Sequence, residues 1–129
     1  MADYAKEELT AIYELGRMYY EMGYLTPAER VFGGLAAVDN GQTAARIGLA
    51  LVKIERGLYQ DAITQLRLAL QLADWEIQVK LALCAAFFGS GEAQRAQSVL
   101  GEVARAINSG AVVDHDVQKL LTAFMRRAR

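Results

Sequence analysis

The same residue pattern recurs three times in this chain at a fixed spacing of 34 positions. Gly23, Gly57 and Gly91 fall in register, and around them large residues align with large ones and small with small. The aligned columns are Leu15, Leu49 and Leu83; Gly16, Ala50 and Cys84; Ala28, Ala62 and Ala96; and Phe32, Leu66 and Leu100. A gapless period of this length is typical of helical-hairpin arrays, whose units bury a shared core by stacking.

Each column predicts a structural role. Small residues on facing helices let the helix axes approach closely, and the larger column fills the space beside them. The three glycines should end the first helix of each hairpin, because glycine tolerates the left-handed backbone found there. Thr26 and Glu29 have capping-box spacing around Pro27, which predicts that a second helix begins there. We therefore predict a single all-α domain, a right-handed α-solenoid with a concave groove, with hairpins at about 9–42, 43–76 and 77–110 and a capping helix at about 114–128.

The composition fits such a domain and argues against several functions. The chain has 129 residues, of which 53% are hydrophobic, and its single proline leaves few helix breaks. A net charge of −1 gives no global attraction to nucleic acid. A single cysteine cannot form an internal disulfide, which fits a reducing compartment. No stretch has the length and apolarity of a membrane-spanning segment or signal peptide, so we expect a cytoplasmic protein without membrane insertion.

No residue cluster predicts catalysis, a cofactor or a bound metal. His115 is flanked by Asp114 and Asp116, but consecutive helical residues do not face one site. Cys84 lies in a small-residue column, which favours packing over nucleophilic chemistry. Gly33 and Gly34 match no phosphate-binding motif. We therefore expect a protein that is not an enzyme.

The first helices of the hairpins carry a second apolar face that would line the concave side. It consists of Tyr13, Arg17 and Tyr20, then Ile47, Leu51 and Ile54, then Leu81, Ala85 and Phe88. Since Leu15, Leu49, Leu83 and the small columns already supply a packing face, these nine residues are predicted to be surplus to the core and to bind a partner. On this view Leu51→Asp would abolish binding and leave the fold intact. The alternative is that the N-terminal segment, the C-terminal helix or a second copy of the chain buries this face.

The pattern of small, large and glycine positions resembles the tetratricopeptide repeat (TPR) over about residues 9–110. Lys and Asn residues that grip acidic tails in some TPR domains are replaced here by Tyr13, Arg17, Gly48 and Leu51, so an apolar segment is the expected ligand. Within the TPR family, the chain is similar to the small three-repeat chaperones of bacterial type III secretion systems. The residues that carry this similarity are Tyr13, Leu15, Ala28, Val31-Phe32, Leu35, Val38-Asp39, Gly48-Leu49-Ala50, Lys53 and the run from Gly57 to Ile63.

The resemblance implies a function in bacterial virulence and protein transport. Such chaperones keep translocator or needle subunits soluble in the cytoplasm before export. The resemblance implies that six of the nine face residues line the client groove: Tyr13, Tyr20, Ile47, Leu51, Leu81 and Phe88. The translocator-binding and needle-binding branches both stay open, as do a co-chaperone partner and a homodimer. A general TPR scaffold and a regulatory subunit are the competing hypotheses.

Overall fold

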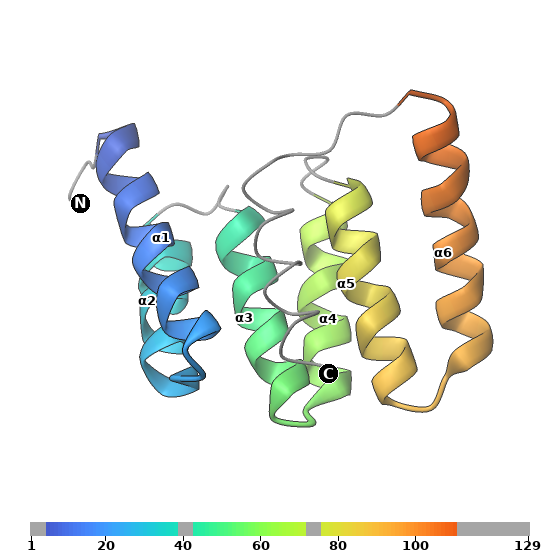
Figure 1. Cartoon of the computed structure of the whole chain (residues 1–129), viewed down its shortest axis with the longest axis horizontal. Helices are drawn as coiled ribbons and strands as arrows, with labels where there is room; N and C mark the ends of the chain where they lie inside the picture. Colours follow the sequence, from blue (N-terminus) through green and yellow to red (C-terminus); the bar gives the residue numbers. More distant parts are fainter. Residues whose placement is uncertain (1–4, 39–42, 72–75, 111–129) are drawn as a thin grey trace.

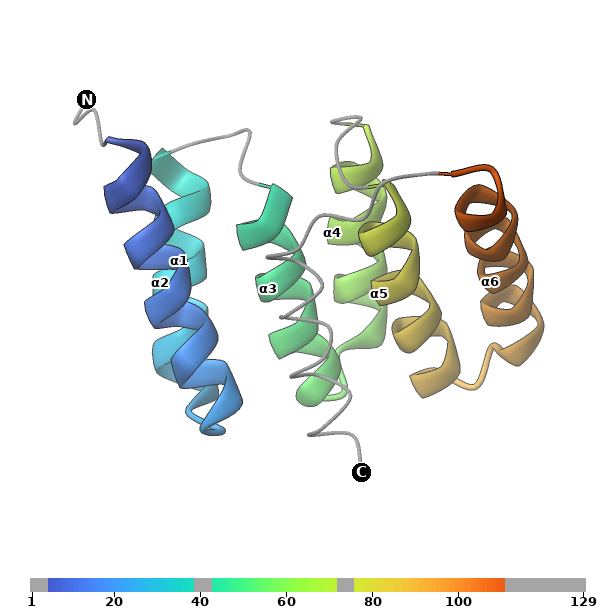
Figure 2. The ribbon, with the colours of Figure 1, turned by 45° about the horizontal axis from the view of Figure 1, so that its top comes forward.

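The described part of the chain, residues 5–38, 43–71 and 76–110 of a computed structural model, consists of α-helices and turns and contains no strand. Its helices are α1 (Lys6–Glu21), α2 (Leu25–Val38), α3 (Thr43–Glu55), α4 (Tyr59–Leu70), α5 (Glu76–Gly89) and α6 (Ala93–Asn108). Successive helices form three hairpins that lie side by side, from α1/α2 at one end to α5/α6 at the other (Figure 1 and Figure 2). The predicted all-α hairpin array is confirmed. The capping helix predicted at 114–128, His115 included, lies outside the described residues.

Each hairpin turns at the predicted glycine. Gly23, Gly57 and Gly91 have φ values of 84°, 77° and 83°, in the left-handed region that favours glycine. In the first turn, the Gly23 amide donates to the Tyr20 carbonyl at 3.1 Å and the Tyr24 amide donates to the Tyr19 carbonyl at 2.9 Å. This pair of hydrogen bonds is the Schellman arrangement, which satisfies the last carbonyls of the helix. The period therefore identified the helix ends correctly.

The Phe32 ring joins the first two hairpins. A β-carbon added at Gly16 of α1 would come within 2.7 Å of this ring, and so would one added at Gly48 of α3. Because both positions are glycine, α1 and α3 pack closely against the Phe32 ring from either side, which explains why the ring is fully buried. Ala28, Ala62 and Ala96 are also fully buried, so the small columns pack as predicted.

Two members of the large columns do not pack as predicted. Leu15 is 44% exposed and Leu100 is 45% exposed, whereas Leu83 and Leu66 in the same columns are buried. The reason is position in the array: Leu15 lies on the first described helix and Leu100 on the last. A residue that meets the neighbouring hairpin inside an array has no such neighbour at its ends.

The capping box predicted for α2 is wrong. The helix begins at Leu25, so Thr26 lies inside its first turn and cannot act as its N-cap. The Thr26 and Glu29 side chains instead contact Arg56 of the next hairpin. Arg56 donates from Nη2 to Thr26 Oγ1 at 2.8 Å and pairs through Nη1 with the Glu29 carboxylate. The polar spacing therefore marks a link between hairpins, which local sequence rules do not anticipate.

Candidate functional site

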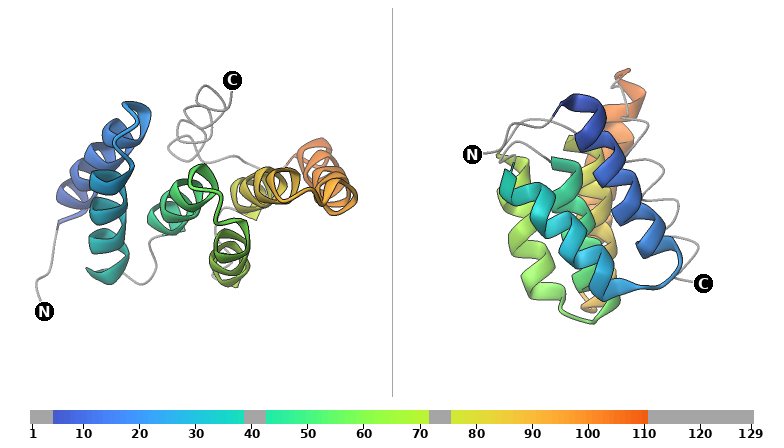
Figure 3. Two further views of the ribbon diagram at one scale, coloured as in Figure 1. Left: turned by 90° about the horizontal axis from the view of Figure 1, so that it is seen from below. Right: turned by 90° about the vertical axis from the view of Figure 1, so that its left-hand side faces the viewer.

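The nine residues of the predicted binding face lie on the first helices α1, α3 and α5, three on each. These helices contact one another directly, α1 with α3 and α3 with α5, in addition to their contacts with the second helices. Figure 3 (left) shows the helix pairs in succession. The nine residues therefore lie on three helices that contact one another in succession.

Five of the nine side chains are buried, which corrects the expectation that this face is surplus to the core. Tyr20, Ile47 and Leu51 have no exposed surface, and Tyr13 and Ile54 are almost fully covered. All five belong to the hydrophobic cluster that runs through the three hairpins. Tyr13 packs against Phe32 with ring centroids 6.0 Å apart, and the Tyr20 hydroxyl donates to Glu55 on α3 at 3.2 Å. Periodicity alone could not separate these side chains from exposed ones, because both kinds are apolar at helical spacing.

Arg17 is tied into the surface of α1. Its guanidinium donates to Glu14 at 2.7 Å and to Glu21 at 2.9 Å, and four-fifths of its side chain is covered. The hydrogen bond to Glu14 raises the pKa of Arg17, against the opposing effect of partial burial. Because two carboxylates of its own helix already hold the charge, Arg17 is a poor anchor for an acidic ligand.

The accessible part of the predicted face is on α5. Leu81 and Ala85 are half-buried against the core and Phe88 is 50% exposed, at spacings of four and three residues along one side of the helix. Lys80 lies beside this row and bonds Glu76 at 2.8 Å and Glu102 of α6 at 3.5 Å. The hydrogen bond to Glu76 raises the pKa of Lys80, and the ammonium charge is paired with carboxylates of the same chain. We call Leu81, Ala85 and Phe88 the α5 row.

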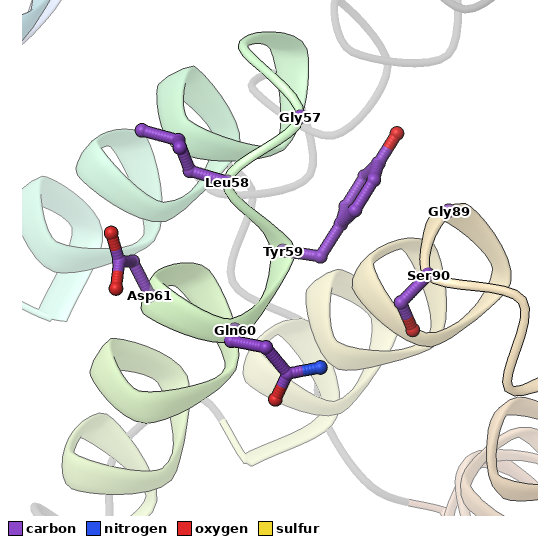
Figure 4. Close-up of a pocket in the computed structure, with 7 residues that line it drawn as sticks. All are labelled: Gly57, Leu58, Tyr59, Gln60, Asp61, Gly89 and Ser90. Atoms are coloured by element: carbon purple, nitrogen blue, oxygen red, sulfur yellow. The ribbon is translucent and has the colours of Figure 1, made fainter.

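A shallow pocket of about 410 Å³ adjoins the end of α5. It is lined by Gly57, Leu58, Tyr59, Gln60, Asp61, Gly89 and Ser90 (Figure 4). The Tyr59 ring fills the space that a β-carbon of residue 89 would need, so Gly89 permits the contact between the two hairpins. The Ser90 hydroxyl donates to Glu92 at 2.7 Å. This pocket is not predictable from the period, because its walls come from two hairpin turns that the 34-residue register aligns without showing that they lie close together.

The chain's single cysteine lies in the core. Cys84 is buried and its thiol donates to the Ala96 carbonyl at 3.5 Å, which fits the predicted packing role. Burial raises the pKa of this thiol and disfavours its reactive thiolate.

Within residues 5–38, 43–71 and 76–110, no three His, Cys, Asp or Glu side chains gather as a metal site would require. None of the helices in those ranges has the length and apolarity to span a membrane.

These features define a TPR-like array of helical hairpins. A solved structure with this fold is that of the Yersinia enterocolitica type III secretion translocator chaperone SycD, in an alternative dimer. The two structures match with a TM-score of 0.74 over 99% of each chain, at 19% sequence identity. The resemblance to this class of chaperone is therefore shown at the level of the fold. Neither a protein-family model nor a curated protein sequence matches the chain.

Proposed function

We propose that this chain is a chaperone that binds an apolar segment of a secreted, self-associating protein and keeps it soluble in the bacterial cytoplasm until export. The observation that carries the proposal is the α5 row, where a half-exposed phenylalanine ends an apolar line on the face of the first helices. The fold shared with a translocator chaperone supports it. A translocator or a needle-type subunit is the client class that we infer.

The exposed and buried members of the predicted site have different roles in this proposal. Leu81, Ala85 and Phe88 contact the client, because their surface is accessible. The other members of the predicted site support that contact surface: Tyr13, Arg17, Tyr20, Ile47, Leu51 and Ile54. An amphipathic helix or an extended segment of the client would lay its apolar side chains along the α5 row.

A photo-crosslinking experiment in the native cell tests the proposal. A photoreactive phenylalanine analogue replaces Phe88, and the matched control carries it at Leu68 of α4, where the native side chain is 46% exposed. We expect a crosslinked partner from position 88 and none from position 68. That partner should aggregate when expressed alone and stay soluble when co-expressed with this chain.

Other outcomes would contradict the chaperone function in distinct ways. A partner that is soluble by itself would identify a scaffold. A partner whose catalytic or DNA-binding activity changes on binding would identify a regulatory subunit. Equal crosslinking from positions 88 and 68 would show that the α5 row is not the binding surface.

A further inference from the structure

The outer side of α1 carries an apolar row that no described helix covers. Ala11, Leu15, Met18 and Met22 follow one another at spacings of four, three and four residues. Leu15, Met18 and Met22 are 44%, 51% and 60% exposed. Figure 3 (right) looks onto this end of the array, with α1 and α2 in front. We call these four residues the α1 edge.

The internal hairpins show what normally covers this position. One period further on, Met18 corresponds to Val52 of α3, and two periods on it corresponds to Ala86 of α5. Both of those residues are fully buried, because α2 packs against α3 and α4 packs against α5. The α1 edge is therefore the side of a first helix that receives the second helix of a preceding hairpin. End faces of repeat arrays are normally polar, so an apolar end face of this extent indicates a partner.

A row of carboxylates runs beside the α1 edge. Glu7, Glu14 and Glu21 are spaced seven residues apart, which places them on one line along the helix. The whole of α1 holds four glutamates and only two basic residues. Arg17 bonds both Glu14 and Glu21, so a single cation serves two of these carboxylates. The flank of the α1 edge thus stays acidic, and a covering helix with basic flanks complements it.

A second copy stacked head to tail does not fit this edge. Glu14 occupies the register that Gly48 and Ala82 hold in the internal hairpins. At Gly48 the Phe32 ring lies so close that an added β-carbon would come within 2.7 Å of it. In a stack of copies, Leu100 of one chain would instead meet the Glu14 carboxylate of the next. Burying that charge against an apolar side chain costs free energy.

A two-fold pair of α1 helices fits no better. Antiparallel pairing would set the two glutamate rows against each other, and like charges at that position destabilise a helix pair. Parallel pairing would set each row against Ile12 and Tyr19 of the other copy, which offer no cation. The charge pattern therefore selects against self-association.

We propose that the α1 edge binds a basic amphipathic helix of another polypeptide, apolar at the same spacing and carrying Lys or Arg along its flank. This helix takes the place of the second helix of a hairpin preceding α1. The surface lies on a different helix from the α5 row, so the proposal is independent of client binding.

Two synthetic helical peptides of about three heptads test the proposal. Both peptides carry Leu at the positions that would face the α1 edge. At the positions beside these, one peptide has Lys and the other has Glu. Fluorescence anisotropy at low salt measures their affinities for the full chain. We expect the Lys peptide to bind at least about ten-fold more tightly than the Glu peptide, with an affinity that falls as salt is added.

Matched variants locate the binding. Met18→Lys should weaken the Lys peptide at least about ten-fold, because it adds a like charge and removes half-exposed apolar surface. Leu68→Lys makes the same change on α4, which does not contact α1, and should leave the affinity unchanged. Phe88→Asp should also leave it unchanged, which separates this surface from the client site. Circular dichroism confirms that each variant is folded.

Three results would overturn the proposal. The first is that neither peptide binds, and the second is that both bind equally well. The third is that the chain sediments as a dimer that Met18→Lys dissociates, because the occupant would then be a second copy.

Discussion

Truncation of Leu51 to alanine should strongly destabilise the protein. Leu51 has no exposed surface and lies in the cluster that joins the three hairpins. Leucine-to-alanine changes at such positions cost about 2–5 kcal/mol, the sum of lost apolar transfer and the cavity left behind. With a slope of about 2 kcal/mol per molar urea, the unfolding midpoint should fall by roughly 1–2.5 M.

Urea unfolding followed by circular dichroism at 222 nm measures this effect. Leu68→Ala is the matched control, since it deletes the same atoms from a side chain that is 46% exposed, and it should cost less than about 1 kcal/mol. Leu51→Asp should unfold the chain, because an unpaired buried carboxylate costs several kcal/mol more and total stabilities are about 5–15 kcal/mol. A loss below about 1 kcal/mol for Leu51→Ala would contradict the burial of Leu51 in the core and would indicate that its side chain lines an open groove.

Two further predictions concern glycine and cysteine. Gly33 lies at an open position within α2, so Gly33→Ala should stabilise the protein by about 0.5–1 kcal/mol in the same urea assay. Gly57 has a φ of 77°, so Gly57→Ala should destabilise the protein by about 1–2 kcal/mol. Equal effects of the two variants would contradict the turn assigned to Gly57. Burial raises the pKa of Cys84 in the folded protein above its ordinary value of 9.0. The neutral thiol therefore contributes to the free energy of unfolding below pH 9.0, and this contribution is lost as the pH rises through the pKa of the folded protein. At pH 8 a thiol reagent should therefore label the native protein at least about ten-fold more slowly than the urea-unfolded chain, and equal rates would show an accessible Cys84.

The sequence predicted the architecture well because the period encodes it directly. Gly23, Gly57 and Gly91 end the first helices, and Ala28, Ala62 and Ala96 pack where small residues were expected. These features depend on local backbone geometry and on contacts repeated in every unit. Both leave a signal that recurs along the chain.

The candidate site was only partly predictable, because exposure depends on which neighbours are present. Tyr20 lies one period before Ile54 and Phe88 lies one period after it, yet Tyr20 is fully buried and Phe88 is half exposed. In the same way, Met18 is exposed where Val52 is buried, since α2 packs against α3 whereas no described helix packs against that side of α1. The α1 edge could have been found from the sequence by asking which column of the first repeat lacks a neighbour.

The most direct test of the central claim is the affinity of the crosslinked client for matched variants of the chain, measured by isothermal titration calorimetry. The exposed half of Phe88 contributes about 1–1.5 kcal/mol of binding free energy when the client buries it, and Phe88→Asp removes this contribution. The new carboxylate, placed where the client packs, adds a further cost of about 1–3 kcal/mol of binding free energy. The account predicts a loss of affinity of at least about thirty-fold for Phe88→Asp and no change for Leu68→Asp. Unchanged affinity for Phe88→Asp, or an equal loss for both variants, would contradict the claim that the α5 row binds the client.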